Sequence, residues 1–73
     1  MTPLQQTMLA FANNLRKMRI EKKLSFLELE DLSGVSYKTI QKIETGTENV
    51  NMNTIFLLAH GLGVNYQILL TPQ

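Results

Sequence analysis

The spacing of the apolar residues constrains this chain most, because apolar residues recur at three- and four-residue steps along most of its length. This spacing is typical of amphipathic helices that bury one face. The first such stripe consists of Met8, Phe11, Ala12, Leu15 and Met18. The sequence therefore predicts a helical fold that begins with a helix over about residues 8–22.

Capping residues and glycines divide the rest of the chain into further helices. A Ser or Asn side chain can accept a hydrogen bond from a free backbone N–H of the first turn, and glycine commonly follows the last turn. The candidate N-caps are Ser25, Ser36, Asn51 and Asn65, and the candidate stops are Gly34, Gly46, Gly61, Gly63 and Pro72. They predict helices over about 26–33, 37–45, 52–62 and 66–70, with a polar loop over 47–50.

The small size of the chain limits how stable one copy can be. Its 73 residues form one domain, 1–73, and contain no cysteine for a disulfide, a zinc site or a thiol nucleophile. A chain this short buries only about 60% of its unfolded surface, so we expect self-association. No apolar run reaches the ~18–20 residues that span a bilayer, and residues 1–11 lack a signal-peptide pattern. We therefore expect a soluble, cytoplasmic protein without a membrane partner.

The basic residues are concentrated in one part of the chain. The formal net charge is only +1, yet all 7 Lys and Arg residues lie between Arg16 and Lys42. Such clustering can create one basic edge on a nearly neutral protein and favours nucleic acid as a partner.

The helices 26–33 and 37–45 have the outline of a DNA-binding helix-turn-helix over about 25–45, with Gly34 in the turn. The candidate DNA-binding residues are Ser25, Ser36, Tyr37, Lys38, Thr39, Lys42 and Arg16. Lys38 and Lys42 lie one turn apart and can donate to guanine O6 and N7 or to phosphate. Ser36 can cap a helix and approach a phosphate at the same time. The alternative for the lysines and for Arg16 is a solvated surface.

The chain from about Leu15 to Leu70 resembles the Cro and phage-repressor (XRE) family. The matching residues are Leu24-Ser25, Leu29, Gly34-Val35-Ser36, Thr39-Ile40, Ile43-Glu44-Thr45-Gly46, Thr54, Leu58-Ala59, Leu62-Gly63-Val64 and Leu69. The resemblance implies an all-α, five-helix, lambda-repressor-like fold whose third helix enters the major groove. It also implies dimers on palindromic operators and an internal ion pair between Arg19 and Glu44.

Three residues in the helix-turn-helix and the loop after it depart from the family pattern. Phe26 stands where most members have a glutamine that contacts phosphate, and Glu30 stands where they have alanine. Glu30 must reach water or find a cation, for which Lys38 and Lys42 are candidates. Glu48 lies in a loop that is often basic in the family. These departures predict modest affinity for DNA.

An apolar patch on the last two helices, 52–70, favours a homodimer. It consists of Phe56, Leu57, Tyr66 and Ile68, of which Leu57 and Ile68 occupy positions that are usually polar in the family. An uncovered patch of this kind marks an interaction site. Alternatively, these residues thicken the core beneath residues 4–9. A two-fold dimer would place the two recognition helices ~34 Å apart and predicts a palindromic site.

Nothing in the sequence favours catalysis. His60 is the one histidine, and no metal-ligand pattern or glycine-rich phosphate loop accompanies it. Glu28, Glu30 and Asp31 are close neighbours on one short helix that do not converge on a point, which favours a solvated face. We therefore expect no enzyme activity, no cofactor, no metal and no small-molecule ligand.

These observations together predict a homodimeric, DNA-binding transcriptional regulator that acts as a repressor on double-stranded DNA. The chain ends just after its fifth helix, so we expect a stand-alone regulator of the size of Cro or of a restriction-modification controller. The alternative is an antitoxin-like or anti-repressor protein-interaction module that keeps the fold with weakened DNA contacts. Phe26, Glu30 and Glu48 favour this alternative.

Overall fold

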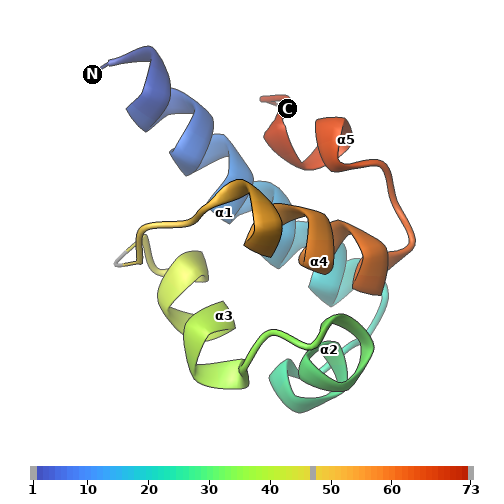
Figure 1. Cartoon of the computed structure of the whole chain (residues 1–73). Coiled ribbons are helices and arrows are strands. Elements are labelled where there is room, and N and C mark those ends of the chain that lie inside the picture. Colours follow the sequence, from blue (N-terminus) through green and yellow to red (C-terminus); the bar gives the residue numbers. More distant parts are fainter. Residues whose placement is uncertain (1, 47, 73) are drawn as a thin grey trace.

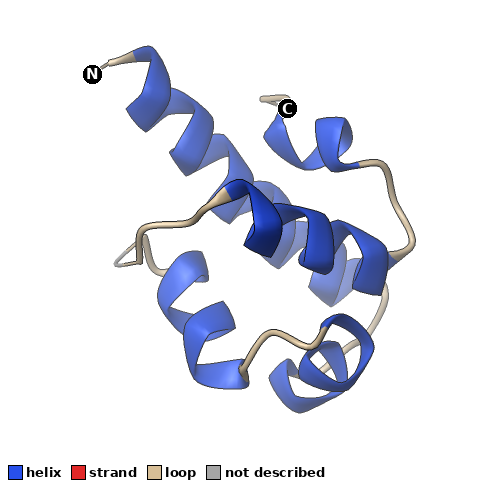
Figure 2. Cartoon of the chain, in the orientation of Figure 1, coloured by secondary structure: helices blue, strands red, loops and turns tan. Residues whose placement is uncertain are grey.

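Short loops connect the helices of this protein (Figure 2). The computed structural model describes residues 2–46 and 48–72, so residue 47 of the predicted loop lies outside the described residues. The described residues form five helices: α1 (Pro3–Glu21), α2 (Phe26–Ser33), α3 (Tyr37–Glu44), α4 (Met52–Leu62) and α5 (Tyr66–Leu70). The predicted all-α fold class is confirmed.

Side-chain caps mark the start of every helix from α2 to α5. Ser25, Ser36, Asn51 and Asn65 each accept a hydrogen bond from a backbone N–H in the first turn of the helix that follows. Each such bond satisfies one of the N–H groups that a helix start leaves without a partner. The four predicted N-caps are therefore confirmed.

The first helix begins earlier than the apolar spacing predicts. Thr2 is its N-cap, and its hydroxyl accepts from the Gln5 N–H at 3.1 Å while the Gln5 side chain accepts from the Thr2 N–H at 2.8 Å. This capping box adds Pro3–Thr7 to a helix that was expected to start at Met8. The predicted start was wrong because polar residues, which carry no apolar period, fill most of this first segment.

Gly61 lies inside α4 and does not end it, contrary to the sequence-based expectation. The helix continues to Leu62, and Gly63 forms the C-cap with φ 72°. A Cβ atom on Gly61 would lie 2.8 Å from the Cβ and 3.0 Å from the Cα of Ser33. The missing side chain at position 61 therefore allows α4 to approach the end of α2 closely.

The core lies where all the helices meet. Figure 1 shows α4 crossing the middle of the molecule, with α2 and α3 on one side and α5 on the other. The largest fully buried side chains of the core are Phe11, Leu15, Leu29, Ile40, Ile43, Ile55, Leu58 and Leu69. Leu32 and Met52, although apolar, are exposed.

Asn14 is a buried polar residue that joins α1 to α5. Its side-chain Nδ2 donates to the backbone carbonyls of Leu69 at 2.9 Å and Thr71 at 2.7 Å, and lies 3.4 Å from that of Ile68. Carbonyls at the end of a helix have no partner within the helix. Asn14 thus satisfies the end of α5 and holds this short helix against α1.

No helix within residues 2–46 and 48–72 is both long and apolar enough to cross a lipid bilayer.

Candidate nucleic-acid interface

The turn between α2 and α3 is held by hydrogen bonds on both sides of Gly34. The Gly34 N–H donates to the Glu30 carbonyl at 2.8 Å, and Gly34 has φ 79°, which favours glycine. The buried Ser33 hydroxyl donates to the Leu29 carbonyl at 2.7 Å and accepts from the Val35 N–H at 3.1 Å. These bonds set the direction in which α3 leaves the turn.

The exposed face of α3 carries the basic residues. Ile40 and Ile43 are buried, whereas Lys38 and Lys42 are exposed and Tyr37 is half-buried. Residues three and four positions apart share one face of a helix. Tyr37, Lys38 and Lys42 therefore lie together on the side of α3 that faces away from the core.

Gln41 belongs to the same face but was not among the residues predicted to bind DNA. It is exposed and lies three residues after Lys38 and four after Tyr37. A glutamine amide can bind adenine N6 and N7 through two hydrogen bonds. Gln41 could have been predicted from the sequence, because the apolar Ile40 and Ile43 mark the inner face of this helix and Gln41 lies on the opposite face.

Ser36 and Thr39 form a small hydroxyl pair at the start of α3. The Ser36 hydroxyl accepts from the Thr39 N–H at 3.2 Å and donates to the Thr39 hydroxyl at 2.9 Å. Both side chains thereby stabilise the first turn. Because the Thr39 hydroxyl is the acceptor in this pair, it can still donate a hydrogen bond to a group outside the protein, such as a phosphate.

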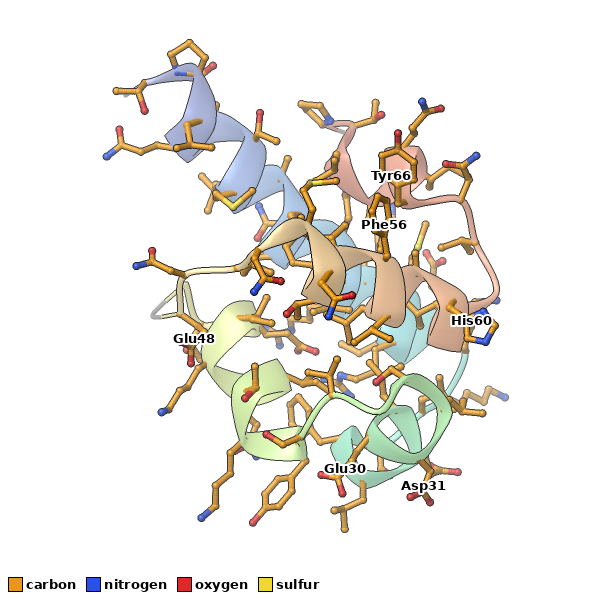
Figure 3. The ribbon with its side chains drawn as sticks, viewed as in Figure 1. Glu30, Asp31, Glu48, Phe56, His60 and Tyr66 are labelled. Atoms are coloured by element: carbon orange, nitrogen blue, oxygen red, sulfur yellow. The ribbon has the colours of Figure 1, made fainter. Side chains whose placement is uncertain are left out.

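The Glu30 carboxylate lies at the start of α3 and binds its backbone. Its Oε1 accepts from the Tyr37 N–H at 2.7 Å, and the residue is half-buried. Figure 3 shows Glu30 on the side of α2 that faces α3 and Asp31 on the other side. The expectation that Glu30 must reach water or pair with Lys38 or Lys42 missed this backbone partner, because the sequence does not show how closely the turn brings α2 to α3.

Ser25 and Arg16 lie on other elements. The Ser25 hydroxyl accepts from the Glu28 N–H at 3.0 Å, and the Ser25 N–H donates to the Glu28 carboxylate at 2.9 Å. The bond from this backbone N–H, with one from the Ser25 side chain, holds the pKa of Glu28 below its usual value of 4.5. Ser25 thus caps α2, whereas Arg16 is exposed on α1.

Arg19 and Glu44, for which the resemblance implies an ion pair, are in contact through two hydrogen bonds. Arg19 Nε lies 2.7 Å from Glu44 Oε2, and Nη2 lies 3.0 Å from Oε1. Arg19 Nη1 also donates to the Leu24 carbonyl at 2.9 Å, and the Phe26 ring lies 4.0 Å from the guanidinium carbon. Phe26 therefore covers the ion pair that ties the end of α3 to α1.

The four residues of the predicted dimer patch lie on neighbouring parts of α4 and α5. The rings of Phe56 and Tyr66 meet edge to face, with centroids 4.8 Å apart. Phe56, Leu57 and Ile68 are 46%, 37% and 43% exposed, and Tyr66 is half-buried. We call these four residues the α4–α5 apolar patch. Figure 3 shows its two aromatic rings at the end of the molecule away from Glu30.

His60 is exposed near the end of α4 and lies well apart from Glu30 and Asp31 (Figure 3). Across residues 2–46 and 48–72, no three His, Cys, Asp or Glu side chains are grouped so that they could hold a metal ion.

Comparison with known proteins identifies relatives of this arrangement. Residues 15–69 match the family described as Helix-turn-helix. The chain is 37% identical over 60 residues to the uncharacterized HTH-type transcriptional regulator y4dJ of Sinorhizobium fredii, a match that covers 82% of this chain and 78% of the relative. It also resembles the crystal structure of the restriction-modification controller protein C.AhdI from Aeromonas hydrophila. That match has a TM-score of 0.80 and 32% identity, and it covers 85% of this chain and 94% of C.AhdI.

Proposed function

Because this chain belongs to the XRE-type helix-turn-helix family of DNA-binding transcriptional regulators, we propose that it represses transcription by binding a palindromic operator as a homodimer. The observation that carries this proposal is the exposed face of α3, where Lys38, Gln41 and Lys42 stand opposite the buried Ile40 and Ile43. A helix that presents such side chains from a rigid support can read the edges of bases in the major groove.

Each candidate residue has a role in this proposal. Lys38, Gln41 and Lys42 contact base edges, and Tyr37 contacts a thymine methyl group or a phosphate. Ser36 and Thr39 set the first turn of α3 where it meets the DNA, and the Thr39 hydroxyl can donate to phosphate. Ser25, at the start of α2, and Arg16, on α1, contact the DNA backbone and add sequence-independent affinity.

The homodimer forms through the α4–α5 apolar patch. Three of its four residues are exposed, and its labelled aromatic residues, Phe56 and Tyr66, lie well apart from Glu30 (Figure 3). A second copy would cover the patch and leave both α3 helices open. The two helices would then meet successive turns of DNA, ~34 Å apart, on a palindromic site.

Repression requires little more than occupation of the operator, since a bound dimer blocks other proteins from the same DNA. The match to a restriction-modification controller is consistent with a regulatory role. A cytoplasmic location belongs to the same proposal, because a regulator must share a compartment with its DNA.

The alternative function, a protein-interaction module with decayed DNA contacts, loses two of its three supporting features. Phe26 packs over Arg19, and Glu30 binds the backbone of α3, so both residues have structural reasons to differ from the family pattern. Only Glu48 among the three is left in support of the alternative.

Fluorescence anisotropy over a salt series tests the proposal. We would compare binding to the DNA upstream of the gene with binding to a random duplex, for the wild type and for Lys38→Ala/Lys42→Ala. The double variant should lose about 1–3 kcal/mol of specific binding for each base contact removed. Lys17→Ala/Lys22→Ala removes the same charge from the α1 region and is the matched control.

Equal losses in the two double variants would show that α3 does not read bases. Sedimentation of Ile68→Lys, which should be monomeric where the wild type is dimeric, tests the α4–α5 contact separately.

A further inference from the structure

We propose that the Glu30 carboxylate keeps DNA phosphates away from the N-terminus of α3 and so lowers the affinity of this protein for any duplex, whatever its sequence. The inference rests on the proposed function, in which α3 enters the major groove. It adds a residue of α2 that limits affinity and makes no base contact.

The first turn of a helix normally offers free N–H groups and a partial positive charge, which attract phosphate. In α3 the chain itself binds two of these groups. The Tyr37 N–H donates to Glu30 Oε1 at 2.7 Å, and the Thr39 N–H donates to the Ser36 hydroxyl at 3.2 Å. A phosphate that approached the Tyr37 N–H would have to displace a carboxylate.

The residues that precede and follow Glu30 fix the position of its backbone. Its neighbour Leu29 is fully buried, and its own backbone carbonyl accepts from the Gly34 N–H in the turn. The half-buried side chain therefore stays bound to the backbone of Tyr37, a residue that the proposed function assigns to DNA. Asp31, the next residue, is exposed and points away from α3 (Figure 3).

The effect of this charge does not depend on base sequence, because every nucleotide carries a phosphate. A carboxylate beside the entering end of α3 repels the nearest phosphates on a specific site and on a random site alike. The remaining affinity for DNA comes from the side chains further along α3. Tight binding therefore requires that both copies of the proposed dimer contact the DNA.

The substitution Glu30→Gln tests the inference, because it removes the charge and keeps the hydrogen bond. The glutamine Oε1 can still accept from the Tyr37 N–H. Asp31→Asn is the matched control, because it makes the same charge change one residue further along α2. Anisotropy would be measured with both duplexes over a salt series, and a thermal melt followed by circular dichroism would establish that both variants are folded.

We expect Glu30→Gln to bind both duplexes about three- to tenfold more tightly at low salt, with a salt slope steeper by about one. Asp31→Asn should change either affinity less than about twofold, because its side chain lies on the side of α2 away from α3 (Figure 3). Equal behaviour of the two variants would overturn the inference. So would weaker binding of Glu30→Gln to the upstream duplex alone, since that result would assign Glu30 a base contact.

Failure of the proposed function looks different in the same experiment. It appears in the wild type, as equal binding to the two duplexes that Lys38→Ala/Lys42→Ala does not change. The random duplex still measures how the charge at position 30 acts on phosphates in that case.

Discussion

Individual polar side chains connect helices that lie far apart in the sequence. Arg19 of α1 binds Glu44 at the end of α3, the Leu24 carbonyl and the face of Phe26. Asn14, also on α1, binds the carbonyls at the end of α5. In a domain this small, total stability is only a few kcal/mol, so each of these contacts is a large part of it.

We expect Glu44→Ala to unfold much of the protein at room temperature. The substitution leaves the Arg19 guanidinium, whose side chain is 12% exposed, without its carboxylate partner. Breaking a buried ion pair costs about 3–5 kcal/mol. Urea unfolding measures the change, and Glu48→Ala, at an exposed position, is the control. A midpoint for Glu44→Ala equal to that of the control would show that the pair contributes nothing.

Asn14→Ala should destabilise the protein by about 1–3 kcal/mol, the cost of leaving buried carbonyls without a donor. It should also weaken the dimer, because α5 carries Tyr66 and Ile68. The neighbouring Asn13→Ala removes an identical group from an exposed position and should change neither property. Thermal melts and sedimentation measure the two effects, and a stable monomeric Asn14→Ala protein would show that the residue acts on the interface alone.

At the scale of whole helices, the packing of α4 against α2 depends on Gly61. Replacing glycine by alanine inside a helix usually stabilises it by about 1 kcal/mol. Here the new Cβ would lie 2.8 Å from the Ser33 Cβ and 3.0 Å from the Ser33 backbone nitrogen.

We therefore expect Gly61→Ala to be destabilising by about 1–3 kcal/mol, the usual cost of overpacking. Thermal unfolding measures it, with His60→Ala on the exposed face of α4 as the control. A melting temperature above that of the wild type would mean that α2 and α4 can separate at little cost.

The number and order of the helices were predictable because their starts depend on local chemistry. Ser25, Ser36, Asn51 and Asn65 cap helices through side chains that lie two or three residues from their partners. The predicted end of α4 at about residue 62 is also confirmed, but which of two glycines ends the helix was not predictable in the same way. Gly61 and Gly63 are both good stops, and only the contact with Ser33, which is remote in sequence, explains why the helix passes through Gly61.

The candidate site was predictable in part for the same reason. The face of α3 follows from helical spacing, so Lys38 and Lys42 could be named from the sequence. The Glu30 bond to Tyr37 crosses a turn whose geometry no local pattern specifies. The same holds for the position of Phe26 over Arg19, which involves two helices and the loop between them.

For the whole molecule, self-association should contribute to stability. Apart from the α4–α5 apolar patch, large side chains such as Leu4 and Leu9 are also exposed, and the single core is small. If the native protein is a dimer, its melting temperature must rise with protein concentration, by mass action.

We expect such a rise for the wild type and none for Ile68→Lys. Differential scanning calorimetry over a hundredfold concentration range measures both. A wild-type melting temperature that does not change with concentration would show that the monomer carries all of the stability.

The partner of Glu30 is a backbone N–H, which any residue except proline would supply at position 37. Substitutions on the exposed face of α3, the face proposed to contact bases, can therefore occur during evolution without disturbing this bond. Conversely, one nucleotide change in a glutamate codon gives alanine at position 30, the residue common in the family, and would alter affinity without altering base preference. If α3 reads bases and Glu30 repels phosphates, as proposed, the two helices let the strength and the target of DNA binding evolve independently.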